Sequence, residues 1–128
     1  MTRLTVQRQT ILDLINGSNH HWDADELART LADNGHSIGI ATIYRGLAAL
    51  ESQGLIESIQ LADKKRYERA DKAHHDHMIC TQCGKIKEFS HQTIEALQQA
   101  EAEKNGFRLT GHQLVMFGHC SACREETV

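Results

Sequence analysis

The stretch HHDHMICTQCGK, residues 74–85, gathers most of the side chains of this chain that could do chemistry. It contains three histidines, one aspartate and two cysteines in close succession. Imidazole, carboxylate and thiolate groups are the side chains that proteins use to bind transition metals. A catalytic metal centre, a redox-active cysteine pair and a set of structural metal ligands all use these residue types. The surrounding sequence therefore has to discriminate among them.

The four cysteines form two matched pairs. Cys80 and Cys83 make one C-x2-C pair, and Cys120 and Cys123 make a second one near the C-terminal end. Four thiolates suit a tetrahedral zinc ion, whose Zn–S bonds are about 2.3 Å long. The alternative is a thioredoxin-like redox pair, which opens a helix after a strand. A glycine and the strand-like KIKEF follow Cys83 instead, so the pattern favours structural zinc.

The histidine run predicts further metal ligands. If residues 74–77 are extended, His75 and His77 point to one side of the strand, and His74 and Asp76 point to the other. One strand could then contribute to two metal sites that residues elsewhere complete. Mixed nitrogen and oxygen ligands suit Fe(II), Mn(II), Co(II) or Zn(II), so ligand type alone leaves the ion open. The candidates for completing the sites are His21, Glu68, Glu88, Glu95 and His112.

The remaining histidines have a simpler interpretation. His20, His36 and His91 are isolated in the sequence, and we expect them to be solvated. His119 precedes Cys120 directly, so either it binds metal or it packs beside the cysteine pair.

Length and charge bound the class of protein. A chain of 128 residues forms one compact domain or two small ones. The net charge of −3 favours neither nucleic acid nor a membrane surface, so DNA binding would depend on a few locally placed cations. No apolar run is long enough to span a bilayer, and the N-terminal residues lack the apolar core of a signal peptide. We therefore expect a cytoplasmic protein, in which stable disulfides are uncommon.

The first half of the chain has the pattern of a winged helix-turn-helix. Residues 4–16 and 39–53 show the apolar spacing of helices. Between them, Asp23 is the expected N-cap of another helix, with Glu26 completing a capping box. Residues 55–69 predict a hairpin with its turn at 62–65, and three helices followed by a hairpin form a winged helix. The expected core side chains are Val6, Ile11, Leu12, Leu14, Ile15, Leu27, Ala28, Leu31, Ile40, Ile43, Leu47 and Leu50.

The second half predicts a small mixed α and β structure. HMIC and KIKEF are expected to be strands around a turn at 81–84, and LVMFGHC to be another strand. A helix over 91–105 would point Ile94, Leu97 and Ala100 inward. So small a domain has a marginal core, so we expect a bound metal or a partner subunit to stabilise it.

Four segments together resemble the ferric uptake regulator family of bacterial metal-sensing repressors. They are NHHWDADEL, GIATIYRGL, HHDHMICTQCGKIKEF and GHCSAC, and the resemblance extends from about Leu4 to Cys123. It implies an α+β fold with a winged helix-turn-helix DNA-binding domain over residues 1–70. Residues 71–77 would be a hinge that carries metal ligands, and residues 78–128 would be a small α/β dimerisation domain with a structural zinc site.

The resemblance also assigns the metal ligands. Structural zinc would be bound by Cys80, Cys83, Cys120 and Cys123. A regulatory Fe²⁺, which Mn²⁺, Co²⁺ or Zn²⁺ could replace, would be bound by His21, Glu68, His75, His77 and Glu88. An additional site would consist of His74, Asp76, Glu95 and His112.

The regulatory ligands indicate which metal or oxidant the protein would respond to. Glutamates at both Glu68 and Glu88 resemble the iron-sensing branch, whereas the peroxide-sensing branch tends to carry aspartates there. No cysteine lies outside the two pairs, which disfavours a zinc sensor with a thiolate in its regulatory site. We expect an Fe(II)-responsive repressor, with zinc-, manganese- or peroxide-responsive regulators as the alternatives.

The expected partners are double-stranded operator DNA with an inverted repeat and further copies of the chain, as a dimer or a tetramer. On the helix over 39–53, Arg45 could bind a guanine edge or a phosphate, and Tyr44 could contact a thymine methyl. By pattern alone, Tyr44 could equally pack against the wing and Arg45 be solvated; the resemblance favours recognition. The candidate DNA contacts are Arg3 (for the minor groove), Ser37, Thr42, Tyr44 and Arg45.

Two functions of other classes use the same residue types. A metal-dependent hydrolase needs an open coordination position and a substrate cleft, and the sequence contains neither H-E-x-x-H nor the H-x-E and P-C-x-x-C signature of zinc deaminases. A zinc-stabilised protein-interaction module would use the helix-turn-helix pattern only as core. We therefore expect this protein to be a regulator and not an enzyme.

Overall fold

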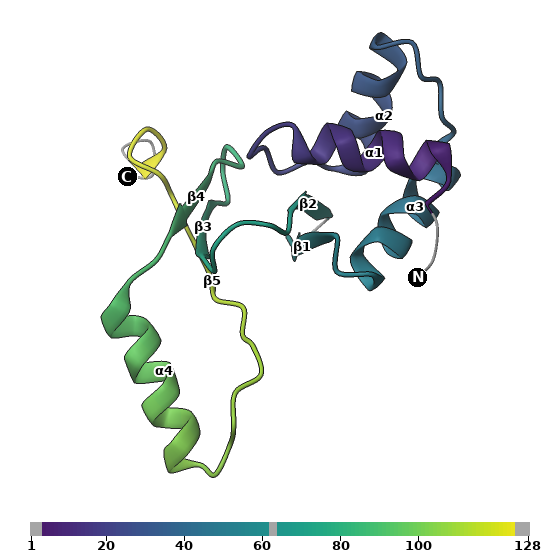
Figure 1. Ribbon diagram of the computed structural model, residues 1–128. Coiled ribbons are helices and arrows are strands. Elements are labelled where there is room, and N and C mark those ends of the chain that lie inside the picture. Colours follow the sequence, from purple (N-terminus) through teal and green to yellow (C-terminus); the bar gives the residue numbers. More distant parts are fainter. Residues whose placement is uncertain (1–3, 62–63, 125–128) are drawn as a thin grey trace. The chain divides into compact units, whose positions relative to one another are not determined.

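The computed structural model describes residues 4–61 and 64–124, which belong to two compact units that divide between Lys72 and Ala73 (Figure 1). Unit 1 is the N-terminal part and unit 2 the C-terminal part. Arg3, Ala62 and Asp63 lie outside the described residues. Among the described residues, no helix has the length and apolar character needed to cross a membrane.

Unit 1 consists of three helices followed by a hairpin. The helices are α1 (Val6–Asn16), α2 (Ala24–Asp33) and α3 (Ile40–Ser52). Strands β1 (Ile56–Gln60) and β2 (Lys65–Arg69) pair antiparallel, with Ser58 opposite Tyr67. The predicted winged helix-turn-helix is confirmed.

The capping box predicted for α2 is present. The Oδ1 atom of Asp23 accepts the backbone N–H of Glu26 at 2.8 Å, and Oε1 of Glu26 accepts the N–H of Asp23 at 3.0 Å. Two N–H groups that the helix leaves without partners are thereby satisfied. This reciprocal pair fixes the point at which the chain enters α2, directly after His21 and Trp22.

The core of unit 1 lies between the three helices and the hairpin. Ile11, Leu27 and Leu47 are fully buried there. A Cβ added to Gly46 would lie 3.1 Å from Cδ1 of Ile11, so this glycine permits the close approach of α1 and α3. The expectation that Val6 and Ile40 are core residues is wrong, because both lie in the first turn of their helices, beyond the core, and are 84% and 42% exposed.

One contact extends the hairpin sheet beyond what the sequence predicted. Trp22 forms an isolated antiparallel bridge with Tyr67 of β2. The Trp22 N–H donates to the Tyr67 carbonyl at 2.8 Å, and the Tyr67 N–H donates to the Trp22 carbonyl at 2.7 Å. The segment that contains His21 is therefore held against the wing.

Unit 2 is a three-stranded sheet with one helix. Its elements are β3 (Asp76–Cys80), β4 (Ile86–Phe89), α4 (Gln92–Lys104) and β5 (Val115–Gly118). The strand order is β4-β3-β5, with β3 antiparallel to β4 and parallel to β5. A parallel pair requires a long crossover connection, which α4 and the segment after it supply (Figure 1).

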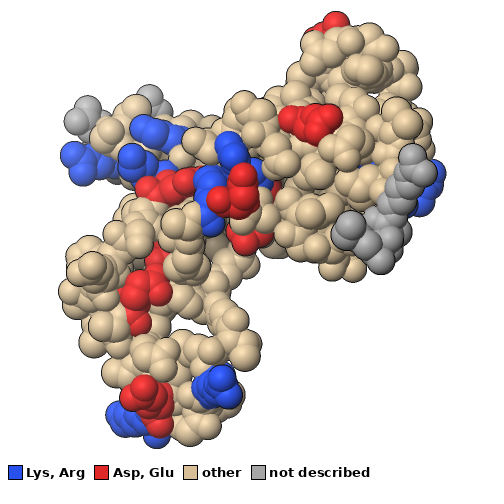
Figure 2. Space-filling view, in the orientation of Figure 1, with Lys and Arg blue, Asp and Glu red and all other residues tan. Residues whose placement is uncertain are grey.

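The predicted inward face of α4 is only partly correct. Ile94 is half-buried, but Ala100 is exposed and Leu97 is 64% exposed. The amphipathic pattern requires a surface to pack against, and a single copy of unit 2 does not cover this part of the helix. Acidic and basic side chains gather at the C-terminal end of α4, at the bottom of Figure 2.

Candidate metal centres

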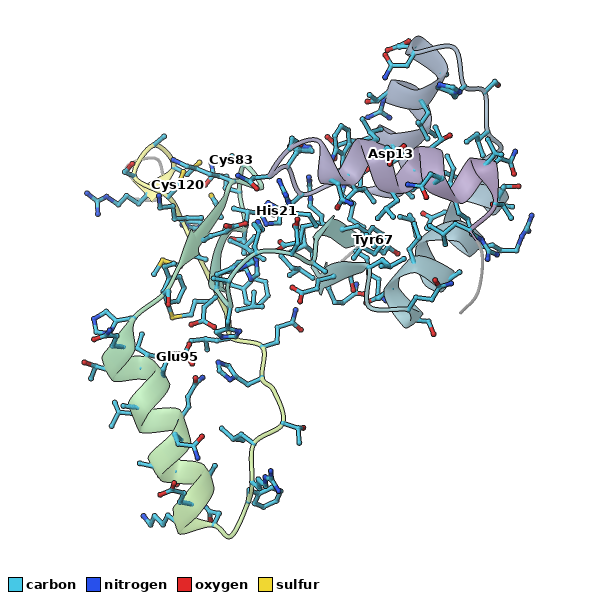
Figure 3. The ribbon with its side chains drawn as sticks, viewed as in Figure 1. Asp13, His21, Tyr67, Cys83, Glu95 and Cys120 are labelled. Atoms are coloured by element: carbon cyan, nitrogen blue, oxygen red, sulfur yellow. The ribbon has the colours of Figure 1, made fainter. Side chains whose placement is uncertain are left out.

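The four cysteines form a compact group in unit 2, and all four are free thiols. Their sulfur atoms lie within 4.8 Å of one another. The Sγ atoms of Cys83 and Cys120, labelled in Figure 3, are 3.7 Å apart. A tetrahedral site with Zn–S bonds of about 2.3 Å places its sulfurs about 3.8 Å apart. The group therefore fits a zinc ion.

Backbone N–H groups decide which thiol ionises first. The N–H groups of Cys83 and Cys120 point at Sγ of Cys80 at 3.4 and 3.5 Å, and they lower the pKa of that thiol to about 5. The N–H of Cys123 likewise lowers the pKa of Cys120. The Cys123 thiol donates to the sulfur of Cys120, which raises the pKa of Cys123 to about 12. In the absence of metal, the proton on Cys123 is therefore shared with the sulfur of Cys120.

A second group in unit 2 contains two imidazoles and two carboxylates, His74, Asp76, Glu95 and His112. The Nε2 atom of His74 lies 3.0 Å from Nε2 of His112 and 3.3 Å from Oε1 of Glu95. Oδ1 of Asp76 lies 3.4 Å from the same nitrogen of His74. The group joins the start of β3, the first turn of α4 and the segment that precedes β5.

Burial makes this second group a good receptor for a cation. Asp76 is completely buried, and neither of its carboxylate oxygens has a hydrogen-bond partner among the described residues. The Oε1 atom of Glu95 is also buried without a hydrogen-bond partner among the described residues. A buried carboxylate without donors is unfavourable unless a cation compensates it. The donor set of nitrogen and oxygen atoms therefore fits a divalent ion.

Unit 1 contains a pair of residues of types that bind metal, His21 and Glu68. The Nε2 atom of His21, which is labelled in Figure 3, is 2.6 Å from Oε2 of Glu68 on β2. Glu68 is 1% exposed, and the Nζ atom of Lys72 lies 3.6 Å from its other carboxylate oxygen. An imidazole and a buried carboxylate are thus held together inside the winged helix.

Unit 2 contains a corresponding set at the start of β3. His77 lies opposite Glu88 in the sheet, and the rings of His75 and His77 are 4.6 Å apart. The Nδ1 atom of His75 lies 3.0 Å from the carbonyl oxygen of Ala73. Because a carbonyl oxygen only accepts, Nδ1 carries a proton in this contact, and the other ring nitrogen, Nε2, lies 3.6 Å from Oε1 of Glu88. Histidines that bind metal commonly donate their other ring N–H to a carbonyl oxygen in this way.

The other histidines lie apart from these groups. His20 pairs with Glu26 at 3.0 Å, and His36 and His91 are exposed, as expected. His119 is exposed and is not a member of the cysteine group.

The candidate DNA contacts on and before α3 are accessible. Ser37 and Arg45 are exposed, and Tyr44 is 52% exposed. The guanidinium of Arg45 donates to Oγ1 of Thr42 at 3.2 Å. In the view of Figure 2, the face over α1 and α2 carries acidic patches and otherwise few charges.

The pattern of the ferric uptake regulator family matches residues 1–117. This chain belongs to the ferric uptake regulator family. It is 41% identical over 128 residues to the ferric uptake regulation protein of Escherichia coli K12, covering 97% of this chain and 86% of that protein. Its fold is similar to that of the Francisella tularensis ferric uptake regulator with iron, with a TM-score of 0.87, 35% identity and coverage of 96% and 95%.

A third relative adds a description of metal sites. The Helicobacter pylori ferric uptake regulator has a TM-score of 0.87 and 33% identity, with coverage of 92% of this chain and 82% of that one. Its structure is described as revealing three functional metal binding sites. Members of this family are dimeric, DNA-binding transcription factors. The chain is accordingly a metal-responsive transcription regulator and not an enzyme, and the hydrolase alternative is wrong.

Proposed function

We propose that this chain is an Fe(II)-responsive repressor that binds inverted-repeat operator DNA as a homodimer when its regulatory site holds metal. The observation that carries the proposal is the division of one set of ligand types between the units. His21 and Glu68 are paired in unit 1, and His75, His77 and Glu88 are gathered in unit 2. The two imidazoles and one carboxylate of unit 2 could hold Fe(II) by themselves, and His21 and Glu68 would raise the number of protein ligands to five. One ion shared by both would join the two units.

The metal assignments follow from the donor atoms. Cys80, Cys83, Cys120 and Cys123 would hold structural Zn²⁺. The regulatory set, with nitrogen and oxygen donors, would hold Fe²⁺, for which Mn²⁺, Co²⁺ or Zn²⁺ could substitute. His74, Asp76, Glu95 and His112 would form an additional site. The iron in the Francisella tularensis structure and the three sites of the Helicobacter pylori regulator support this division.

Metal would control DNA binding by limiting the orientations that the two units adopt. Without regulatory metal, the hinge around residues 70–73 would let unit 1 take many orientations. With metal, the two α3 helices of a dimer would be held at half-site spacing. Because metal and DNA would then bind to the same restricted state, each must strengthen the other. A nearly complete switch requires about 5.5 kcal/mol of differential affinity, which several coordination bonds can supply.

The proposed homodimer accounts for the apolar surface of unit 2. Met116 and Phe117 of β5 are 39% and 58% exposed, and Met78, Leu97 and Phe107 are exposed as well. Soluble chains usually cover apolar surface of this kind with a partner. The mass of the protein in solution, measured by light scattering, distinguishes a dimer from the alternative tetramer.

Ser37, Thr42, Tyr44 and Arg45 would reach the major groove from α3 and the segment that precedes it. Arg3 is proposed for the minor groove. Arg45→Ala is expected to weaken operator binding by about 1–3 kcal/mol if its guanidinium is bidentate to a guanine edge. Binding to an AT-rich inverted repeat, measured by fluorescence anisotropy at a fixed salt concentration, would show this loss.

The decisive experiment removes two proposed regulatory ligands. The His77→Ala, Glu88→Ala double variant is titrated with Fe(II) and with Mn(II) while binding to the operator duplex is measured. Metal-dependent affinity should be lost, because unit 2 keeps only one of its three regulatory ligands. His91→Ala, Glu103→Ala removes the same residue types from exposed positions and should bind like the parent. Unchanged metal dependence in the first variant would refute the proposed switch.

The identity of the ion is tested in the same assay. Fe(II), Mn(II), Co(II) and Zn(II) are compared at buffered free concentrations, with and without hydrogen peroxide. Fe(II) should promote binding at free concentrations at which Mn(II) does not. Activation by Zn(II) or Mn(II) alone, or release of the DNA by peroxide, would assign the chain to another of the alternatives.

A further inference from the structure

Three consecutive residues of β2 hold the segment that carries His21. Arg66 donates from Nη1 to the carbonyl oxygen of His21 at 3.2 Å. Tyr67 exchanges two backbone hydrogen bonds with Trp22. Glu68 contacts the His21 ring at 2.6 Å. His21 and Tyr67 are both labelled in Figure 3. Both the backbone and the ring of His21 are therefore bound to one strand.

The guanidinium of Arg66 has a second anchor. Its Nη1 atom lies 3.4 Å from Oε1 of Glu26, the oxygen that also accepts the N–H of Asp23 in the capping box. The Arg66 side chain is only 19% exposed. A largely buried guanidinium with two fixed acceptors has one defined position. It connects the backbone of His21 to the start of α2.

The loop that leads to His21 is anchored by the contact of His20 with Glu26 at 3.0 Å. Residues 16–20 are all exposed, whereas His21 is 9% exposed. The contacts with β2 and with the capping box therefore help to set the position of His21. Without the Arg66 contact, the carbonyl of His21 would lose its link to both.

We infer that Arg66 is a positioning residue of the regulatory metal site: its contact with the His21 backbone keeps the imidazole beside Glu68. This rests on the proposed function, in which His21 and Glu68 bind the regulatory ion. Arg66 does not itself bind metal, because a guanidinium stays protonated and has no lone pair to offer. Residues that orient metal ligands in this way typically contribute about 10–100-fold to metal affinity.

The sign of the effect separates positioning from electrostatics. Arg66 is a cation close to a proposed cation site, so removing its charge alone should strengthen metal binding. Loss of positioning should weaken it. Lys64→Gln is the matched control, because it removes the same charge from the same hairpin, and Lys64 contacts Asp23 at 3.1 Å instead of His21.

The experiment uses the full chain loaded with zinc and titrated with Mn(II). Binding is measured by paramagnetic broadening of imidazole NMR signals. Because Mn(II) broadens signals beyond the group that binds it, the regulatory group is read at His21 in a His112→Ala background, and the additional group is read at His112 in a His21→Ala background. Arg66→Gln should weaken Mn(II) binding at His21 by about tenfold or more and leave binding at His112 unchanged. Lys64→Gln should leave binding at His21 equal or tighter. Arg66→Lys should restore part of the loss, because it keeps the charge and one donor group.

A metal-free measurement provides a second readout. The Trp22 amide, which pairs with Tyr67, should exchange its hydrogen faster in Arg66→Gln than in the parent or in Lys64→Gln. Unchanged or tighter Mn(II) binding at His21 in Arg66→Gln would overturn the inference, as would an equal loss at His112. If Arg66→Gln does not fold, the same criteria apply to Arg66→Lys, with a smaller expected loss.

Failure of this inference is distinguishable from failure of the proposed function. In the His112→Ala background, His21→Ala should lower the Mn(II) affinity reported by the His77 imidazole. If it does not, His21 is not a regulatory ligand and the proposed site is wrong. If His21→Ala lowers this affinity and Arg66→Gln leaves binding at His21 unchanged, only the role of Arg66 is refuted.

Discussion

Asp76→Asn is expected to stabilise the metal-free protein and to remove the stabilisation that metal gives through the additional group. Asp76 is completely buried, and both of its carboxylate oxygens lack hydrogen-bond partners among the described residues. A second carboxylate, Glu95, contacts the same imidazoles of His74 and His112. Without a bound cation, the buried carboxylate of Asp76 therefore faces these imidazoles, at 3.4 and 3.7 Å, without a hydrogen bond among the described residues.

The magnitude follows from this geometry. A buried polar group without a partner costs about 1–3 kcal/mol, and more when it is charged. Asparagine has nearly the same shape without the charge, and its amide can donate toward the nitrogens of His74 and His112, which lie 3.4 and 3.7 Å from Oδ1 of Asp76. We expect a gain of about 1–2 kcal/mol, or about 4–10 °C in melting temperature for a domain of this size.

Metal should act in the opposite direction. Mn(II) at about one hundred times its dissociation constant adds about 2.7 kcal/mol to a protein with one intact site. The assay is thermal unfolding of zinc-loaded protein with and without Mn(II), in a His21→Ala background that weakens the proposed regulatory site and leaves unit 2 unaltered. Asp13→Asn, at an exposed position of α1, is the control for loss of one charge.

The parent should therefore respond to Mn(II) and the variant should not, while the metal-free variant melts at the higher temperature. A metal-free Asp76→Asn protein that melts below the parent would refute the reasoning, because the carboxylate would then stabilise the fold by itself. An unchanged response to Mn(II) would show that Asp76 does not bind the ion.

Three further predictions concern the zinc group, the α2 cap and the core. Cys80→Ser should lose zinc and several kcal/mol of stability, since structural zinc contributes about 10–16 kcal/mol in zinc-finger peptides; a stable, zinc-loaded dimer by elemental analysis and light scattering would contradict this. Asp23→Ala should cost about 0.5–2 kcal/mol in urea unfolding near neutral pH. Burial raises the pKa of Asp23, but the Glu26 N–H and Lys64 outweigh it and hold the pKa below its ordinary value of 3.8. The stabilisation is thus present above that ordinary value and lost as the pH falls through the lower folded one, so the two proteins should converge in acid. Leu47→Ala, at a fully buried position, should cost about 2–5 kcal/mol, whereas Tyr44→Ala on the exposed side of α3 should change unfolding by about 0.5 kcal/mol or less.

Local patterns predicted most of the elements. Apolar spacing identified α1, α2 and α3, and the Asp23 and Glu26 pair located the start of α2. These signals succeed because helix periodicity and capping depend on residues within a few positions of one another. The same reasoning failed at Ile40 and Leu97, which are 42% and 64% exposed. An apolar face shows which side of a helix prefers burial, but whether it is buried depends on what packs there.

The metal-binding residue types were also visible in the sequence, but their contacts were not. Paired C-x2-C spacing indicates four thiolates that can bind one ion, and the strand period separates His75 and His77 from His74 and Asp76. The Arg66 hydrogen bond to the His21 carbonyl and the Trp22 bridge to Tyr67 had no such signal. An arginine in a hairpin and a tryptophan before a helix look the same in the sequence whether or not they make such contacts.

The sequence by itself determined the donor atoms, the helices and strands, and the family. Tertiary structure alone decided that Asp76 is buried without a donor and that Arg66 holds the backbone of His21. The physical reason is that ligand type and periodicity are properties of neighbouring residues, whereas burial and a hydrogen bond across 45 positions depend on how distant segments pack.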